Sequence, residues 1–229
     1  MEPPVPPPHA PAPSRVIHEG DGLAWLRASA LTDAHALVTS LPDASELRSL
    51  SFDAWRAWFV DTAALVCERT AAGSVSVFYQ TDVLREGRWV DKGFLVAQGA
   101  ERAGAACLFH KIVCREAPGT ATYGRPGYAH LLAFSRGLRT QIAQATPDVL
   151  PGLGHMPWSK AMGTAACEAV CDFLRRSTAC EVVVDPFCGQ GTMLAVANAR
   201  GYHAVGVELS PRRAALARRL RWPAEGTAP

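Results

Sequence analysis

The sequence predicts an α/β fold built on a mostly parallel sheet of seven strands, one of them antiparallel. From Arg15 onward, short apolar runs alternate with amphipathic stretches, a pattern typical of βαβ units. Two of the runs are separated only by the turn-rich stretch EAPGTATYGRPG, which favours an antiparallel strand at the edge of the sheet. With 229 residues, 48% of them hydrophobic and 19% charged, the chain is long enough for one such domain with a sizeable core.

We expect strands where continuous apolar or β-branched residues fill short runs between turn signals. They span residues 15–18, 34–39, 74–80, 106–113, 128–135, 181–184 and 204–207. Helices are expected where apolar residues recur at spacings of three and four, as in the series Trp55, Phe59, Ala63 and Val66. They cover residues 23–26, 52–68, 92–102 and 159–176, a stretch that follows the loop 185–192, and the basic segment from residue 211 onward.

Outside this α/β pattern, the composition excludes several classes of protein. Residues 1–14 are proline-rich and read as a disordered tail, or as a docking peptide for a partner. The net charge of +2 gives no strong attraction to polyanions, so a nucleic acid would need a local basic face. An odd count of seven cysteines argues against a disulfide framework. No run of about 18 apolar residues occurs, so we expect a cytoplasmic protein with no membrane partner.

The stretch VVVDPFCGQGTMLAVANARGYHAVGVELS holds the strongest signal for a ligand site. A buried strand ends at Asp185, and a turn with Gly189 and Gly191 leads into a helix. Glycines let the backbone approach a ligand closely, and the helix N-terminus presents free N–H groups. Glu208 ends the next strand, where a carboxylate can accept hydrogen bonds from both hydroxyls of a ribose. The pattern is not G-x-G-x-x-G, and Asp185 suits a cationic cofactor better than a pyrophosphate.

DPFCGQGT closely resembles the D-P-F-x-G-x-G-T signature of amino-methyltransferases that use S-adenosylmethionine (SAM), particularly the β-class DNA enzymes that methylate adenine N6 or cytosine N4. HEGDGLAWL followed by ALVTSLPD is similar to the opening of those enzymes, GYAHLLAFSR to one of their strands, and HMPWSKAM to the segment before their cofactor loop. The resemblance implies a Rossmann-like SAM methyltransferase fold, circularly permuted. Residues 15–229 would form this domain, with a substrate-side half over residues 15–150 and a SAM-binding half over residues 151–220.

The resemblance also implies which residues bind SAM. Glu208 would hold the ribose, and Asp21 would contact the adenine. Pro157 and Ser159 would lie beside the methionine carboxylate, and Lys160 matches the lysine of the segment before the loop. The methionine part would be held by the loop residues Asp185, Pro186, Phe187, Cys188, Gly189, Gly191 and Thr192.

The candidate catalytic residues are Ser40, Leu41, Pro42 and Asp43, which stand where the family has Asp, Asn or Ser, then Pro-Pro and an aromatic residue. The Ser40 hydroxyl and the Leu41 carbonyl can accept hydrogen bonds from an amine that attacks the methyl group. Asp43 replaces the aromatic residue that would stack on a flipped-out base. It can act as an extra acceptor, as a general base, or as the N-cap of a helix.

The missing aromatic residue leaves the methyl acceptor open. Tyr79 and Tyr123 could stack on a base, although packing is the more common role of such residues. The link between Gly137 and His155 is too short for a separate domain that reads a duplex. We therefore expect an N-methyltransferase acting on RNA, plausibly tRNA. The alternatives are a DNA adenine-N6 or cytosine-N4 enzyme whose specificity comes from a partner, and a non-catalytic SAM- or nucleic-acid-binding module.

Further clusters carry no catalytic assignment. Strand alternation separates Cys107 from His110, so no metal site is expected there. Cys188 lies within the cofactor loop rather than on the substrate side, which argues against a nucleophile. Arginines near the site and in the last helix could form a modest basic rim, or simply suit a solvated helix. They are Arg115, Arg125, Arg136, Arg139, Arg212, Arg213, Arg218 and Arg219. The sequence leaves the oligomeric state open, with a homodimer among the possibilities.

Overall fold

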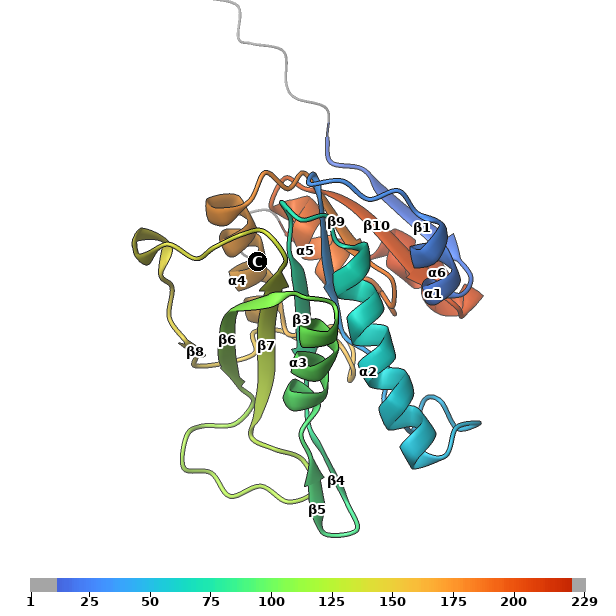
Figure 1. The fold of residues 1–229 in the computed structure, drawn as a ribbon, viewed down its shortest axis with the longest axis vertical. Coiled ribbons are helices and arrows are strands. Elements are labelled where there is room, and N and C mark those ends of the chain that lie inside the picture. Colours follow the sequence, from blue (N-terminus) through green and yellow to red (C-terminus); the bar gives the residue numbers. More distant parts are fainter. Residues whose placement is uncertain (1–11, 224–229) are drawn as a thin grey trace, which may run out of the picture.

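The computed structural model describes residues 12–223. These residues form an eight-stranded sheet with helices on both faces, and a separate two-stranded hairpin (Figure 1). In spatial order, the strands of the large sheet are β1 (Arg15–Glu19), β10 (His203–Glu208), β9 (Val182–Asp185), β2 (His35–Thr39), β3 (Ser76–Gln80), β7 (Tyr128–Ser135), β6 (Ala106–Cys114) and β8 (Val149–Leu150). All neighbouring pairs are parallel except the two that β7 makes, with β3 and with β6.

The α/β class, the seven predicted strands and the single antiparallel strand are confirmed, but two details of the sheet were wrong. An eighth strand, β8, has only two residues and pairs with the outer side of β6. The antiparallel strand β7 also lies inside the sheet rather than at its edge. The chain turns back after β6 and β7 inserts between β6 and β3, so that it is paired on both sides.

The first and last strands of the sheet are neighbours. β1 pairs with β10 in parallel, from Arg15 opposite Ala204 to Glu19 opposite Glu208. β9 and β10, which come from the expected SAM-binding half, therefore lie between β1 and β2 of the substrate-side half. This arrangement is compatible with the circular permutation that the resemblance implies, but the permutation stays a prediction.

Strand alternation gives the sheet two apolar faces. In β2, Ala36 and Val38 point to one face and Leu37 to the other. The first face packs on α4 (Thr164–Ser177), α5 (Thr192–Ala199) and α6 (Pro211–Arg219). The second packs on α1 (Gly22–Ala28), α2 (Phe52–Arg69) and α3 (Lys92–Arg102), as Figure 1 shows for α2 and α3. A sheet covered on both faces places its functional edge at the strand ends.

Side-chain caps explain where several helices begin. Asp21, Ser51, Asp91 and Ser210 each accept a hydrogen bond from a backbone N–H in the first turn of α1, α2, α3 and α6, respectively. Such caps satisfy N–H groups that have no partner within the helix. The predicted bounds of the helix over residues 92–102 are confirmed without change.

In two places the local structure differs from what the sequence predicted. The hairpin of β4 (Val83–Arg85) and β5 (Arg88–Val90) was missed, because its turn uses Glu86, at φ 50°, before Gly87 instead of the usual Asn or Asp. α4 begins at Thr164 rather than at residue 159. Its N-cap is Gly163, and a Cβ there would lie 2.2 Å from the Leu153 carbonyl oxygen, so the preceding residues pack closely as an irregular segment.

The predicted disordered tail lies largely outside the described residues. Within it, Ser14 is ordered: its N–H donates to His203 Nδ1 (3.0 Å), and its carbonyl accepts from the Ala204 N–H (2.9 Å). The disordered tail stays a prediction, and Ser14 at its end is hydrogen-bonded to β10. Within residues 12–223, no helix combines the length and apolar character needed to cross a membrane.

Candidate active site

The main cavity lies at the carboxyl ends of the parallel strands. Its volume is about 310 Å³, which is in the usual range for small-molecule sites. The wall takes residues from the ends of β10, β9, β2 and β3, from the start of α1, and from the segment before α4. In doubly wound folds this edge is where ligands bind.

The predicted cofactor loop forms one wall of this cavity. Gly189 (φ 56°) and Gly191 (φ 80°) both adopt left-handed backbone conformations, which explains why glycine occupies these positions. A Cβ on Gly189 would lie 2.9 Å from the Trp158 ring, so the turn also requires close packing. Gly191 caps α5, whose first residue, Thr192, lines the cavity.

Asp185 ends β9 and is buried, with 6% exposure. Its Oδ1 accepts hydrogen bonds from Thr39 Oγ1 (2.7 Å) and from the Phe187 N–H (3.0 Å). Burial raises the pKa of Asp185 to about 7, an effect that the two hydrogen bonds oppose and the nearby Glu208 charge reinforces. The cavity therefore holds a desolvated carboxyl group that a cationic ligand would stabilise in its ionised form.

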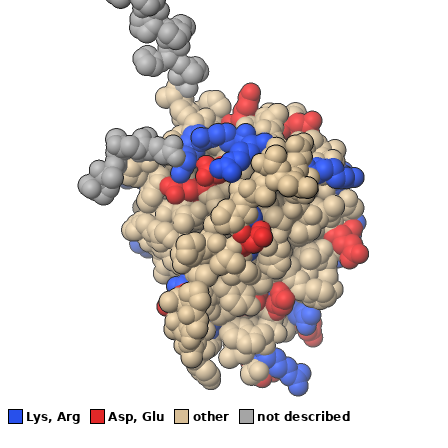
Figure 2. Space-filling model, turned by 90° about the vertical axis from the view of Figure 1, so that its left-hand side faces the viewer, with Lys and Arg blue, Asp and Glu red and all other residues tan. Residues whose placement is uncertain are grey.

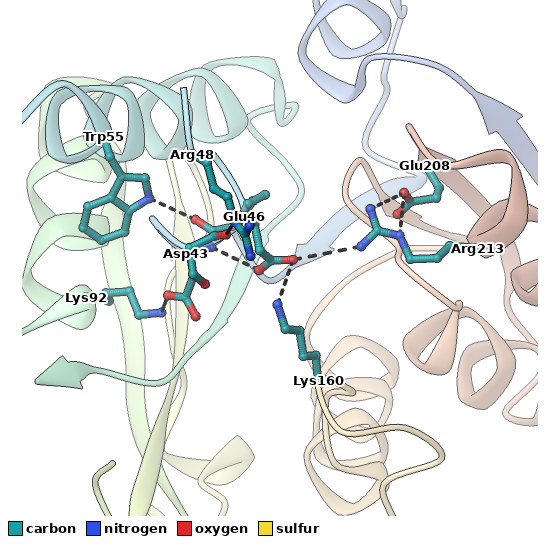
Figure 3. Close-up of polar contacts among 10 residues, drawn as sticks. Asp43, Glu46, Arg48, Trp55, Lys92, Lys160, Glu208 and Arg213 are labelled. Carbon is teal, nitrogen blue, oxygen red and sulfur yellow. Dashed lines mark hydrogen bonds and ion pairs between the residues drawn. The ribbon is translucent and has the colours of Figure 1, made fainter. Parts of the chain in front are cut away.

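Glu208 ends β10 and is equally buried, but it has partners that the sequence did not reveal. Its Oε1 accepts from the Ser210 N–H (2.7 Å) and from Arg213 Nε (2.9 Å), and Arg213 completes an ion pair at 2.7 Å (Figure 3). Within residues 12–223, the structure gives its second oxygen no hydrogen-bond partner, so one carboxylate oxygen is left for a ligand. The terminal arginines thus include one cavity residue, Arg213.

The predicted adenine contact, Asp21, lines the cavity and also caps α1, accepting from the Ala24 N–H at 2.7 Å. Gly22 follows, and a Cβ there would lie 2.0 Å from the carbonyl oxygen of Pro186. The start of α1 therefore presses directly on the cofactor loop. Phe187 and Trp58 add aromatic rings to this wall, with centroids 6.2 Å apart.

The segment before α4 contributes Met156, Trp158, Ser159, Lys160, Ala161 and Met162 to the cavity wall. Lys160 Nζ pairs with Glu46 Oε2 at 3.3 Å, and Glu46 also lies 4.0 Å from Arg213 (Figure 3). Glu46 thus connects the loop that holds the candidate catalytic residues to Lys160 and Arg213 on the predicted cofactor side. Of the predicted cofactor residues, Pro157 and Gly191 lie outside the wall itself, next to residues that form it.

All four candidate catalytic residues line the cavity after β2. Trp55 Nε1 donates to the Pro42 carbonyl (3.1 Å), and the buried Lys92 ammonium forms a close ion pair with the Asp43 carboxylate (Figure 3). No helix begins at residues 44–46, where the chain only turns, so the N-cap interpretation of Asp43 is wrong. Nothing in the sequence pointed to Lys92, which is 49 positions away.

Within residues 12–223, four buried side-chain polar atoms have no hydrogen-bond partner of normal geometry, and all four belong to cavity residues. For one of them, the Tyr79 hydroxyl, the Arg115 side chain is nonetheless close enough to act as a donor and to oppose the rise of its pKa. Leaving such an atom unsatisfied costs about 1–3 kcal/mol, so their concentration in one cavity indicates a polar ligand there. They are Tyr79 Oη, Gln80 Nε2, Trp158 Nε1 and Thr192 Oγ1. Thr192 was predicted as a cofactor contact, and Tyr79 was considered as a residue that could stack on a base. Tyr123, the other aromatic residue considered, is 96% exposed and outside the wall.

The charged groups of the cavity wall are mixed in sign, with five basic and five acidic residues. Arg115 and Arg125 line the cavity, whereas Arg136 and Arg139 donate to backbone carbonyls elsewhere. On the face shown in Figure 2, basic and acidic side chains are interspersed and most of the surface is uncharged. The expected basic rim is therefore limited near the cavity to these two arginines and Arg213.

A second polar cluster lies beside the cavity. Asp82, Asp91 and His130 have ligand-type atoms within 4.8 Å of one another. His130 Nε2 is hydrogen-bonded to Asp82 (3.0 Å), its Nδ1 is hydrogen-bonded to His110 (2.9 Å), and Asp91 caps α3. These mutual contacts account for the cluster as a structural network. Cys188 is buried, and desolvation raises the pKa of its thiol, which agrees with its exclusion as a nucleophile.

The fold is similar to that of solved DNA methyltransferases, although the sequence matches no protein-family model and no curated protein. A putative DNA modification methylase from Thermus thermophilus, also solved with SAM, is 22% identical with a TM-score of 0.65; the alignment covers 89% of this chain and 92% of that one. The cytosine-N4-specific PvuII DNA methyltransferase is 16% identical with a TM-score of 0.68 over 91% and 89% of the two chains. The M1.HpyAVI–SAM complex is 13% identical with a TM-score of 0.61 over 90% and 98%.

Proposed function

We propose that the chain is a SAM-dependent methyltransferase that transfers a methyl group to an amine nitrogen of a nucleic acid. The observation that carries this proposal is the cavity itself. A glycine turn, two buried carboxylates and the residues that carry the four unsatisfied buried polar atoms of the described residues all line one space. That space lies at the edge where doubly wound folds bind their ligands, and two of the similar solved structures are SAM complexes.

The residues present fit SAM. The buried Asp185 carboxyl, whose pKa is raised to about 7, suits the cationic amino-acid end. Thr192 Oγ1 and Trp158 Nε1 offer unsatisfied polar groups on the same side. Glu208 keeps one oxygen for the ribose, and Asp21 lies at the start of α1 for the adenine. When bound, SAM supplies a methyl group on a sulfonium, which leaves as a neutral thioether.

The loop after β2 would hold the acceptor. The Ser40 hydroxyl and the Leu41 carbonyl accept hydrogen bonds from the amine, which directs the nitrogen lone pair toward the methyl carbon. The new nitrogen–carbon bond forms as the sulfur–carbon bond breaks, and the amine loses one proton. Asp43, oriented by its ion pair with Lys92, accepts that proton.

DNA is the first candidate substrate, in place of the RNA expected from the sequence. The short link between Gly137 and His155 argues against a DNA substrate only if enzymes that act on DNA need a recognition domain larger than this link. Alignment with this chain nevertheless covers 92% of the Thermus thermophilus methylase and 89% of the PvuII enzyme. Proteins described as acting on DNA thus have little fold beyond what this chain has, which removes the objection.

Calorimetry tests the cofactor, and label transfer tests the activity. We expect SAM to bind the wild-type protein and to lose affinity at least 10-fold in Asp185→Asn, which preserves shape but removes the charge. Asp148→Asn is the matched control, because that side chain is 84% exposed and far from the loop in sequence. An Asp185→Asn variant that binds SAM as tightly as the wild type would contradict the site.

The protein is then incubated with labelled SAM and genomic DNA or total RNA, followed by DNase or RNase. Label that only DNase releases supports the DNA assignment, and label that only RNase releases would replace it with RNA. SAM binding without any transfer would make the chain a binding module rather than an enzyme.

A further inference from the structure

The basic residues of the cavity wall divide into a paired and an unpaired group. Two of them, Arg115 and Arg125, have no carboxylate within ion-pair distance in the part of the chain that the structure describes, residues 12–223. The other three each have an acidic partner on the same wall. These pairs are Lys92 with Asp43, Lys160 with Glu46, and Arg213 with Glu208 (Figure 3).

The acidic residues of the wall divide in the same way, and their unpaired members lie at the other end of the cavity. Asp21 and Asp185 form no ion pair with any described residue; Asp185 ends β9, and Asp21 precedes α1 beside the cofactor loop. Arg115 directly follows β6, and Arg125 precedes β7. Because β2 and β3 separate β9 from β7 in the sheet, the unpaired charges leave one end of the cavity acidic and the other basic.

The two unpaired arginines are held close to each other. The Arg115 N–H donates to the Gly127 carbonyl (2.7 Å), which closes the loop between β6 and β7 two residues beyond Arg125. The Arg115 side chain is close enough to the Tyr79 hydroxyl to donate to it, and the charges of both arginines oppose the rise of the Tyr79 pKa. Both guanidinium groups therefore lie near one oxygen at the end of β3. Arg125 is exposed and Arg115 half-buried, so a ligand can reach the pair from solvent.

SAM does not account for these two positive charges. It carries a sulfonium, an ammonium and one carboxylate, so its net charge is positive, and it has no phosphate. Its charge suits the acidic end of the cavity, where Asp185 lies. An anion at the basic end therefore belongs to the methyl acceptor. Guanidinium groups bind phosphate oxygens with two parallel hydrogen bonds, which makes phosphate the anion that suits a pair of arginines.

We infer that Arg115 and Arg125 bind the phosphate next to the methyl-acceptor nucleotide. This inference rests on the proposed function and deepens it, because it makes the substrate a nucleotide within a strand rather than a free nucleoside or a protein amine. Phosphate contacts fix the position of a nucleic acid without reading its sequence. They would hold the acceptor at a catalytic loop where Asp43 replaces the stacking aromatic residue.

The first test measures binding, without activity. A fluorescent single-stranded oligonucleotide of mixed sequence is titrated by anisotropy at several salt concentrations. The double variant Arg115→Gln/Arg125→Gln should bind at least 10-fold more weakly at 50 mM salt. The slope of log K against log salt should become shallower by about 0.7, the value for one phosphate of a single strand. The matched control is Arg139→Gln/Arg219→Gln, which removes the same net charge from exposed arginines outside the cavity wall.

The second test needs no variant of the site. In an oligonucleotide that the wild type methylates, the phosphate on one side of the acceptor nucleotide, and then on the other, is replaced by an uncharged methylphosphonate. We expect kcat/KM of the wild type to fall at least 10-fold for one of the two replacements. The double variant should distinguish that replacement from the normal strand by less than 2-fold, because both changes remove the same contact.

SAM affinity and thermal unfolding separate this inference from the proposed function. Both should stay close to the wild-type values in Arg115→Gln/Arg125→Gln. Equal losses of binding in this variant and in its control would overturn the inference, since only overall charge would then matter. Wild-type turnover that neither methylphosphonate changes, or a large loss of SAM affinity in the variant, would also overturn it and leave the methyltransferase in place. A wild-type protein that binds no SAM would instead overturn the proposed function.

Discussion

Asp185→Asn should stabilise the protein in the absence of cofactor, even though it removes a residue of the site. Asn keeps an oxygen that can accept from both Thr39 Oγ1 and the Phe187 N–H. What it removes is the charge of a carboxylate that burial disfavours. The difference between the ordinary pKa of 3.8 and about 7 corresponds to roughly 4 kcal/mol of unfolding free energy once Asp185 is fully ionised.

The sign follows from proton binding. Because the folded-state pKa of Asp185 is above the unfolded value, the folded protein holds the proton more tightly, and its stability falls as pH rises from about 4 to about 7. The Asp185→Asn variant has no titrating group at this position, so its stability does not fall in this pH range for this reason. The two proteins should therefore have equal unfolding free energies near pH 4 and differ by up to roughly 4 kcal/mol, in favour of Asn, at pH 8.

Urea denaturation of the cofactor-free proteins at pH 4.5, 6 and 8 measures this difference. A SAM concentration of about 100 times the wild-type Kd should then stabilise the wild type by about 2.7 kcal/mol and Asp185→Asn by about 1.4 kcal/mol or less, because its affinity is at least 10-fold lower. A stability difference that does not depend on pH, or an Asp185→Asn variant that is less stable than the wild type at pH 8, would refute the conclusion that burial raises the pKa of Asp185.

Gly22→Ala should weaken SAM binding and lower the free energy of unfolding by about 1–3 kcal/mol, because its Cβ would lie 2.0 Å from the Pro186 carbonyl oxygen and push α1 off the cofactor loop. Gly152→Ala, with nothing within 4 Å, is the control, and equal urea midpoints for the two variants would contradict the close packing. Asp43→Asn should cost about 3–5 kcal/mol, because it leaves the buried Lys92 ammonium without its partner. The double variant Asp43→Asn/Lys92→Met should recover most of the lost stability but should not recover methyl transfer. A double variant as unstable as Asp43→Asn would show that loss of the ion pair does not cause the destabilisation.

Local chemistry determined the parts of the site that the sequence could predict. Asp185, Gly189 and Gly191 stand within seven residues of one another, and a strand, a left-handed turn and a helix start are all set by neighbours in the chain. Such a loop can therefore be recognised before the fold is known. The same holds for the helix over residues 92–102, whose cap and apolar spacing are both local.

Contacts between distant segments were decided only by the tertiary structure. The residue that satisfies Asp43 is Lys92, brought to it by the packing of α3 beside the loop after β2. Gln80 looked like an ordinary strand end until the sheet placed β3 next to β2 and left its amide nitrogen without a partner. The interior position of β7 also could not be predicted from nearby residues, because it depends on which strand edges of the sheet are available for pairing.

The sequence by itself therefore determined the α/β class, the order of the main helices and strands, and the glycine turn after β9, because backbone preferences and apolar spacing act over a few residues. The tertiary structure alone decided which side chains face the cavity and which polar atoms there lack a partner. Burial and pairing depend on the whole sheet and its two helical layers, and no short stretch of chain encodes them.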